Sequence, residues 1–175
     1  MTTTPEITLP PLPLEGVRAR LSYDSATGVF RWVDSDRPDR NGKVAGFVRG
    51  TRTKYLYICI GQRKYRVHRL AWFIHYGEWP RMIDHINGDP MDNRIDNLRS
   101  VTNAQNQQNS KLPRNNTSGF KGVTLSKIDW KWHAKINVDS KKIFIGRFDD
   151  PLHAAHAYNK AAIQYHGEFA CLNPL

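Results

Sequence analysis

Apolar positions along the first half of the chain switch between a period of two and a period near three and a half. The longer period predicts short helices over residues 14–22 and 68–77, and His68 is interpreted as a structural residue at the start of the second. The shorter period predicts strands separated by turn residues such as Gly61-Gln62. These strands span residues 29–33, 54–60 and 63–67, with a short further strand near 44–48.

The central stretch, residues 82–109, contains two short apolar runs joined by a loop of turn-forming residues, Asn87-Gly88-Asp89-Pro90. The two runs predict strands at 82–85 and 98–101. Thr102 then precedes Gln105 by three residues, which is the capping-box pattern of a helix start. We therefore expect two strands followed by a helix over about 103–111.

The last third of the chain has its own pattern of strands and one helix. The predicted strands span residues 120–125, 130–138 and 142–148. Asp150 precedes Pro151, which gives a helix N-cap followed by proline at its favoured first position, and Gly167 ends this helix. We expect an α+β chain whose C-terminal part is a three-stranded antiparallel sheet packed on one helix.

The patterns also predict how the chain divides into domains. Residues 1–13 are rich in Thr and Pro and are expected to form a flexible N-terminal segment. A first domain is predicted at 14–111, a polar linker at 112–118 and a second domain at 119–175.

Composition narrows the class of partner. The 175 residues carry a formal net charge of +10, with a pI near 9.8, which favours a nucleic-acid partner. The rival, an anionic membrane surface, lacks support because the sequence has no basic amphipathic helix, no run long enough to span a bilayer and no signal peptide. A cytoplasmic location is therefore expected. Cys59 and Cys171 are too few for a four-cysteine zinc site and argue against a disulfide framework.

The central stretch carries the residues suited to hydrolytic chemistry. Asp84 ends the first predicted strand and Asn106 lies in the first turn of the predicted helix. A carboxylate and an amide oxygen are hard ligands suited to Mg²⁺ or Mn²⁺, and so few protein ligands leave positions for water and a phosphate oxygen. His85 suits a general base, because an unperturbed imidazole has a pKa of about 6.5. Asn97 is expected to fix the loop between the strands.

Each of these residues also has a structural explanation when taken singly. Asp and Asn in loops commonly make turns. Adjacent residues of a strand point to opposite faces, so Asp84 and His85 serve one site only where the strand ends or twists. Asn103 and Asn109 flank Asn106 and are the other candidates for its role.

The order Asp84-His85, Asn97-Leu98 and Asn106 resembles the HNH endonucleases, particularly the group found in phages and mobile introns. The resemblance covers residues 15–111 and includes the run VHRLAW at 67–72. It implies a ββα-metal fold, preceded here by the β-hairpin region, with His85 as general base and Asn97 as a structural brace. Asp84 and Asn106 would hold one divalent metal ion, although many relatives carry His at the position of Asn106.

This resemblance implies a metal-dependent endonuclease that hydrolyses double-stranded DNA and leaves a 5′-phosphate and a 3′-hydroxyl. A homing or nicking role, and the host-cell cytoplasm as location, would follow for a phage-encoded enzyme. One site per chain makes a nick the expected product, with monomer or homodimer left open. The alternatives are a sequence-specific DNA-binding regulator with an inactive nuclease fold, and an RNA-binding or scaffold protein that uses charge alone.

Residues 118–175 resemble the Apetala-two/ethylene-response-factor DNA-binding domain. The resemblance lies in the motifs FKGV at 120–123, WHAKI at 132–136, IGRF at 145–148 and the closing LNP. It implies that the sheet contacts DNA, although core packing is the favoured interpretation for the three aromatic residues because large rings dominate small cores. The predicted DNA-binding residues are Lys121, Thr124, Ser126, Trp130, Trp132, Lys135, Lys142 and Phe144. Thr124 and Ser126 replace family arginines, and Phe144 replaces a family tryptophan, which leaves the base preference open.

Overall fold

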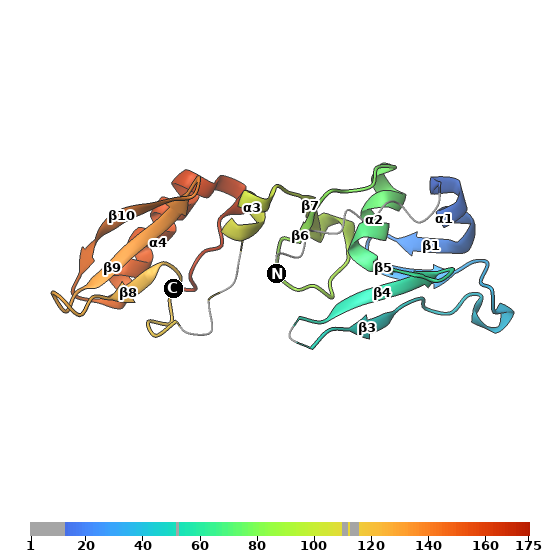
Figure 1. Ribbon diagram of the computed structural model, residues 1–175, viewed down its shortest axis with the longest axis horizontal. Helices are drawn as coiled ribbons and strands as arrows, with labels where there is room; N and C mark the ends of the chain where they lie inside the picture. The colour runs from blue at the N-terminus through green and yellow to red at the C-terminus, as the bar shows by residue number, and fades with distance from the viewer. Residues whose placement is uncertain (1–12, 52, 110–111, 113–115) are drawn as a thin grey trace. The chain divides into compact units, whose positions relative to one another are not determined.

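The computed structural model describes residues 13–51, 53–109, 112 and 116–175, and it has the α+β architecture that the sequence predicts (Figure 1). The packing divides the chain into two units, one ending at Val101 and the other spanning Thr102–Leu175. Most of the predicted N-terminal segment and part of the predicted linker lie outside the described residues. The domain limits 14–111 and 119–175 stay predictions.

The first unit is built from short helices and antiparallel strand pairs. Its strands form three small sheets, β1–β2, β3–β4–β5 and β6–β7. In chain order the elements are α1 (Leu14–Arg20), β1 (Leu21–Asp24), β2 (Val29–Trp32), the 3₁₀ turn η1 (Pro38–Arg40), β3 (Phe47–Arg49), β4 (Tyr55–Ile60), β5 (Arg63–Arg66), α2 (Val67–Tyr76), β6 (Ile83–His85), the 3₁₀ turn η2 (Ile95–Asn97) and β7 (Leu98–Ser100).

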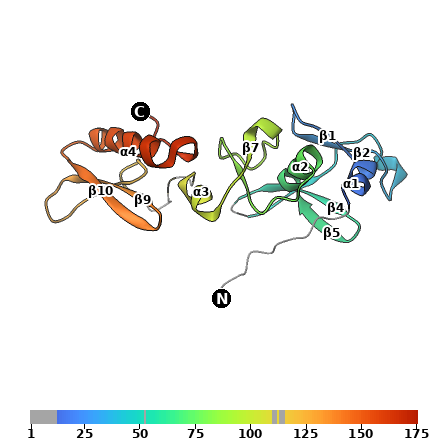
Figure 2. The same ribbon diagram turned by 90° about the horizontal axis from the view of Figure 1, so that it is seen from above.

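The core of the first unit lies between α2 and the neighbouring strands (Figure 2). Leu70 and Ala71 of α2 are completely buried, together with Ile58 of β4 and Phe30 of β2. The predicted hairpin of β4 and β5 is present, and Gly77 ends α2 in the left-handed conformation that glycine adopts readily. Burial of these side chains is the main source of stability for such short elements.

The N-terminal helix is shorter than predicted. It ends at Arg20, whereas the pattern extends to residue 22, and Leu21 begins the unpredicted strand β1. Leu21 is opposite Trp32 in the β1–β2 pair and is 1% exposed. Helical spacing fits this leucine equally well, but pairing with β2 buries it, so the tertiary contact decides its conformation.

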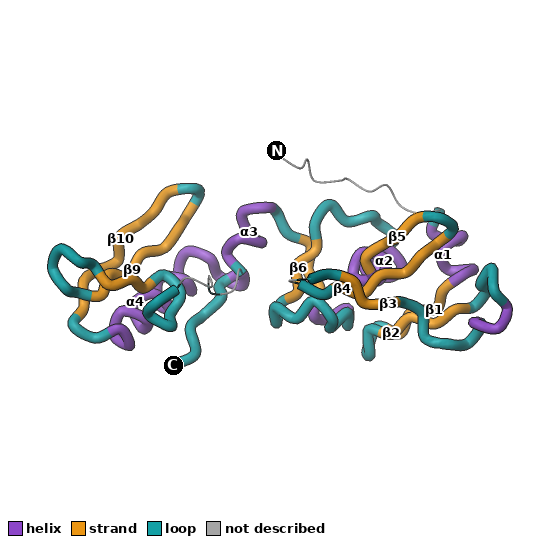
Figure 3. Tube along the Cα trace, turned by 60° about the horizontal axis from the view of Figure 1, so that its bottom comes forward, coloured by secondary structure: helices purple, strands orange, loops and turns teal. Residues whose placement is uncertain are grey.

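The second unit is a three-stranded antiparallel sheet with one long helix on a face, as predicted (Figure 3). The strand order is β10–β9–β8. Its elements are α3 (Asn103–Gln108), β8 (Val123–Leu125), β9 (Trp132–Val138), β10 (Lys141–Phe148), α4 (Pro151–His166) and the 3₁₀ turn η3 (Gly167–Phe169).

Both helices of this unit begin with the caps that the sequence predicts. The hydroxyl of Thr102 accepts from the amide of Gln105, whose side-chain oxygen accepts from the Thr102 amide 2.8 Å away. The carboxylate of Asp150 accepts from the amide of Leu152 at 2.7 Å. These bonds satisfy amides that have no partner within a helix. The predicted end of α3 at Lys111 lies outside the described residues.

Small residues set the distance between α4 and the sheet. Ala154, Ala155 and Ala162 are completely buried on the side of α4 that faces the strands, next to Tyr158. The ring of Tyr158 lies against Gly122, where a Cβ atom would come within 2.2 Å of Tyr158 Cδ2 and 2.6 Å of a backbone oxygen. Glycine is therefore required at position 122 for packing as well as for its φ of +74°.

Gly122→Ala is expected to destabilise the chain more than Gly119→Ala. Both glycines have a φ near +75°, but a Cβ atom at Gly119 meets nothing within 4 Å. The control substitution should cost about 1–2 kcal/mol of unfolding free energy for its backbone conformation. Gly122→Ala should cost about 1–3 kcal/mol more because of the clash. Urea unfolding followed by circular dichroism measures both, and equal losses would contradict the packing role.

Candidate functional site

The strand β6 ends in the predicted pair Asp84-His85. Asp84 is opposite Arg99 of β7, and His85 is opposite Leu98. Both side chains are largely buried, with exposed fractions of 9% for Asp84 and 6% for His85. A titratable pair buried at a strand end is a feature of functional sites more than of ordinary surfaces.

The predicted brace, Asn97, joins the two ends of the β6–β7 loop. Its side-chain oxygen accepts from the amide of Asn87 at 3.0 Å, and its Nδ2 donates to the carbonyl of Asp92 at 2.8 Å. Its backbone carbonyl accepts from the amide of Ile86 at 2.9 Å. One buried amide side chain thus satisfies backbone groups on both sides of the loop.

A second buried amide contacts the imidazole of His85. Nε2 of His85 lies 3.4 Å from Oδ1 of Asn93, while Nδ2 of Asn93 donates to the carbonyl of Met91 at 3.0 Å. Since that donation requires the amide nitrogen to face Met91, the oxygen faces His85 and can only accept. The contact therefore favours the tautomer with a proton on Nε2, which makes Nδ1 the basic nitrogen of the ring.

The surroundings of His85 favour its neutral form. Burial lowers the pKa of His85, although the bond to Asn93 and the charge of Asp84 act in the opposite direction. The ring of His68 packs edge-on at 5.0 Å, and burial holds the pKa of His68 well below its usual range. Tyr55 also lies near, with its ring centroid 6.4 Å from that of His85. A neutral imidazole is the form that accepts a proton.

Asp84 and His85 have different partners, as strand alternation leads one to expect. Oδ2 of Asp84 accepts from both Nε and Nη2 of Arg99, at 3.1 and 2.9 Å. The ion pair joins adjacent strands and is mostly shielded from solvent. Arg99 is a basic group beside the predicted site that the sequence analysis did not select, although the pairing of the two strands places it directly opposite Asp84.

The donor atoms of the predicted metal ligands suit a hard divalent cation, since a carboxylate oxygen and an amide oxygen are typical magnesium ligands. The described part of the chain contains no group of three or more His, Cys, Asp or Glu side chains that could hold a metal ion. Asp84 belongs to the first unit, and Asn106 is an exposed residue of α3 in the second unit. Their joint role as metal ligands stays a prediction.

The N-terminal hairpin supports the loop from outside. The hydroxyl of Tyr23 donates to the carbonyl of Asn93 at 2.8 Å, and the amide of Ile95 donates to the carbonyl of Ser25 at 3.1 Å. Gly28 lies so close that a Cβ atom there would be 2.6 Å from the carbonyl carbon of Asn93. The sequence analysis missed Asn93, because no local pattern marks a contact with a hairpin 65 residues earlier.

Two predicted DNA-binding residues of the second unit, Lys121 and Trp132, are partly buried and make contacts within the unit. Trp132 packs against the core formed with α4, which is the interpretation favoured from the sequence for the aromatic residues. Nζ of Lys121 donates to the carbonyl of Gln108 at 2.6 Å, and burial lowers the pKa of Lys121. Trp132 therefore lies on the face of the sheet that packs on α4, and the ammonium group of Lys121 is bonded within the unit.

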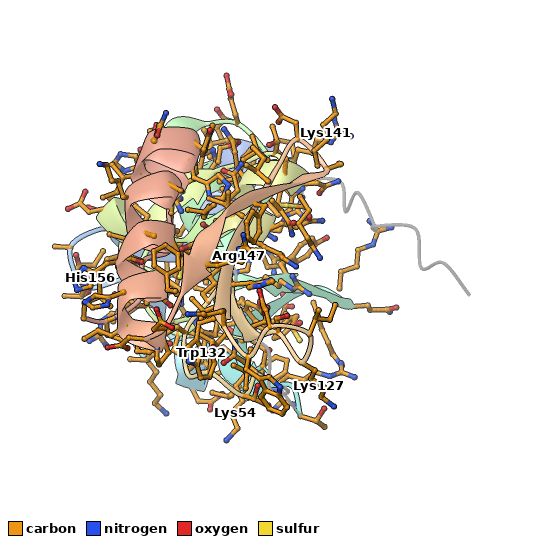
Figure 4. The ribbon with its side chains drawn as sticks, turned by 90° about the vertical axis from the view of Figure 1, so that its left-hand side faces the viewer. Lys54, Lys127, Trp132, Lys141, Arg147 and His156 are labelled. Carbon is orange, nitrogen blue, oxygen red and sulfur yellow. The ribbon has the colours of Figure 1, made fainter. Side chains whose placement is uncertain are left out.

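The other predicted residues are more accessible. Strand alternation turns Thr124, Lys135, Lys142 and Phe144 away from α4, together with Arg147 of β10. Lys141 and Arg147 lie along the sheet and His156 on the opposite side of α4 (Figure 4). Trp130, in the turn before β9, is 73% exposed, and half-buried Ser126 bonds within the same turn. This face combines cations with exposed rings, the composition that suits nucleic acid.

Comparison with known proteins identifies the class of the segment that contains Asp84, His85 and Asn97. Residues 65–108 match the HNH endonuclease family, so the chain contains an HNH endonuclease domain. The chain is also 34% identical to Protein 3.8 of Escherichia phage T7 over 107 residues, which is 60% of this chain and 88% of that protein. The chain therefore belongs to the family of Protein 3.8.

Plant transcription factors give shorter matches. The chain is 36% identical to APETALA2-like protein 2 of Oryza sativa over 61 residues. It is 34% identical over 61 residues to the AP2-like ethylene-responsive transcription factor TOE2 of Arabidopsis thaliana. These matches cover 35% of this chain but only 14% and 13% of the two plant proteins. Separately, none of the described helices is long and apolar enough to cross a bilayer.

The Asp92 carboxylate should make the loop sensitive to acid. Hydrogen bonds from Arg94 lower the pKa of Asp92 to about 2, and Asn87 donates to the same carboxylate at 2.9 Å. A lowered folded-state pKa stabilises the fold above the unfolded value near 4, and that stabilisation disappears as the pH falls through about 2.

Asp92→Asn is therefore expected to lower the unfolding free energy modestly at pH 7 and progressively less below pH 4. Urea unfolding of wild type and variant across this pH range measures the difference. A difference that stays constant down to pH 2.5 would contradict the assignment.

Proposed function

We propose that the protein is a metal-dependent endonuclease that hydrolyses phosphodiester bonds of double-stranded DNA. The observation that carries the proposal is the environment of His85, a buried neutral imidazole oriented by Asn93 inside the segment that matches the HNH endonucleases. The match to Protein 3.8 supports a phage-encoded enzyme, for which a nicking or homing role in the host-cell cytoplasm is part of the proposal.

In the proposed reaction, Nδ1 of His85 takes a proton from a water molecule that attacks the phosphorus atom. The chemical ends of the cut strand depend on which bond to phosphorus breaks. When the P–O3′ bond breaks, the O3′ atom leaves as a 3′-hydroxyl and the other end carries a 5′-phosphate. Asn93 keeps the imidazole in the productive tautomer, and Asn97 holds the loop that carries Asn93. Asn93 and Asn97 are positioning residues, because they act through His85.

Asp84 and Asn106 are the proposed ligands of one Mg²⁺ or Mn²⁺ ion. When bound, such an ion stabilises negative charge on the phosphate and the leaving oxygen. Arg99 already bonds to Asp84, so we expect the guanidinium to turn from the carboxylate toward a phosphate oxygen when DNA and metal are present.

The second unit is proposed to hold the duplex through the open face of its sheet. The partial matches to the plant transcription factors, the exposed Lys142 and Phe144 and the half-buried Lys135 support a DNA-binding domain of the Apetala-two type. Lys135 is opposite Phe144 in the β9–β10 pair, and cations next to an exposed ring suit phosphate and sugar contacts. One nuclease site in each chain supports a nick as the product of a monomer.

A DNA-binding regulator with an inactive nuclease fold is the second candidate. The ion pair between Asp84 and Arg99 favours it, because the guanidinium competes with a cation for the same carboxylate. Titration with Mn²⁺ by calorimetry in the presence of duplex DNA separates the candidates. Binding that Asp84→Asn abolishes supports the nuclease, and absence of binding in the wild type supports the regulator.

His85→Ala is expected to reduce conversion of supercoiled plasmid to open circles by at least about a hundredfold, because it removes the general base. EDTA should stop the wild-type reaction. His75→Ala, which removes an exposed imidazole from α2, is the matched control and should remain active. Nicking by His85→Ala at the wild-type rate would refute the assignment of the base.

Asn93→Leu is expected to lower kcat about tenfold while duplex affinity remains unchanged, because the acceptor that sets the tautomer of His85 is lost. Asn93→Asp keeps an acceptor oxygen and should retain more activity. Single-turnover nicking and fluorescence anisotropy measure the two quantities. Equal activity of the two variants would argue for a purely structural Asn93.

A further inference from the structure

The sheet β3–β4–β5 has two chemically different faces. Ile58, Ile60 and Tyr65 are buried on the face that packs toward the core. Alternation and register place Val48, Leu56 and Arg63 on that same side, and they place the other residues of these strands on the opposite face, which we call the outer face. Besides Cys59, the outer face consists of Phe47, Arg49, Tyr55, Tyr57, Lys64 and Arg66.

Every one of those six side chains is aromatic or basic, and none of the three strands contains an acidic residue. Arg49, Lys64 and Arg66 are exposed, as is the ring of Phe47. Cations attract a phosphodiester backbone through counterion release, and rings between them pack on sugars or bases. Because these strands contribute no carboxylate to the outer face, a phosphodiester backbone would meet no like-charge repulsion from them.

Contacts among these side chains give the face a defined arrangement. The guanidinium carbon of Arg66 lies 4.7 Å from the ring centroid of Tyr55, and its Nε donates to the hydroxyl of Tyr57 at 3.4 Å. The ring of Phe47 stacks on that of Tyr57 with centroids 6.2 Å apart. The arginine is thus oriented before any partner binds, which reduces the entropy lost on binding.

The outer face continues to the candidate base. The ring of Tyr55 lies 6.4 Å from the ring of His85 and 5.7 Å from that of His68, all within the first unit. A polyanionic chain that lies along β4 and β5 would therefore come to the side of the unit where His85 lies.

We infer that the outer face binds the backbone of duplex DNA and guides the strand to be cut toward His85. The inference rests on the proposed nuclease function, because it places the substrate relative to that base. The first unit then has a DNA-binding surface of its own, separate from the sheet of the second unit. Two of its strands, β3 and β4, precede the matched segment 65–108, and β5 overlaps the start of that segment.

Lys64 and Arg63 offer a matched test, because they are adjacent exposed cations on opposite faces of β5. Fluorescence anisotropy of the full chain with a short duplex, in EDTA and over a range of salt, gives the affinity and its salt dependence. Lys64→Gln should reduce the slope of log affinity against log salt by about 0.9, and Arg49→Gln/Lys64→Gln by about 1.8. Arg63→Gln should leave the slope unchanged.

Equal slopes for Lys64→Gln and Arg63→Gln would overturn the inference. Sedimentation velocity gives a second way to overturn the inference. If Lys64→Gln reduces self-association but leaves the duplex affinity unchanged, the outer face is an interface between two copies of the chain and not a DNA-binding surface. Plasmid nicking measured in parallel separates the proposed nuclease function from the proposed DNA-binding role of the outer face. An inactive wild type with the Lys64 effect intact refutes the nuclease alone, and an active wild type without that effect refutes the outer face alone.

Discussion

The side-chain amide of Asn97 is the interaction on which the candidate site depends. The loop between β6 and β7 contributes few apolar side chains to the core, so its shape depends on hydrogen bonds. Asn97 bonds to the backbone at Asn87 and Asp92, which lie on either side of the turn. With these ends fixed, Asn93 reaches His85 with its oxygen, and the imidazole is presented in one tautomer. Loss of this amide would release the loop and, with it, the orientation of the base.

The two units are small, and they bury their apolar side chains in different ways. The first unit buries large side chains such as Phe30 and Leu70 between short elements that could not be stable alone. The second unit brings α4 close to its sheet through alanines, which leaves the opposite face of the sheet open. Both units therefore combine a covered sheet face with an exposed one that is rich in cations and rings.

The sequence predicted much of this arrangement because its signals are local. The caps at Thr102 and Asp150, the β4–β5 hairpin and the order of strands around Asp84-His85 all follow from residues close together in the chain. It did not predict the strand at Leu21 or the contact of Asn93 with His85. Each of these is decided by a partner distant in the chain or across a sheet, which periodicity does not encode.

The close approach of Gly28 to Asn93 makes the first hairpin part of the structure that supports the candidate site. The segment that matches the HNH family begins at residue 65, yet the loop beside His85 rests on a turn near the start of the described chain. A fragment restricted to residues 65–108 would keep His85 and its neighbours in sequence but would lose the hairpin that supports the loop beside His85. The smallest segment expected to hold the candidate site in this arrangement therefore includes the first hairpin, and insertions in that hairpin should disturb the position of the His85 imidazole.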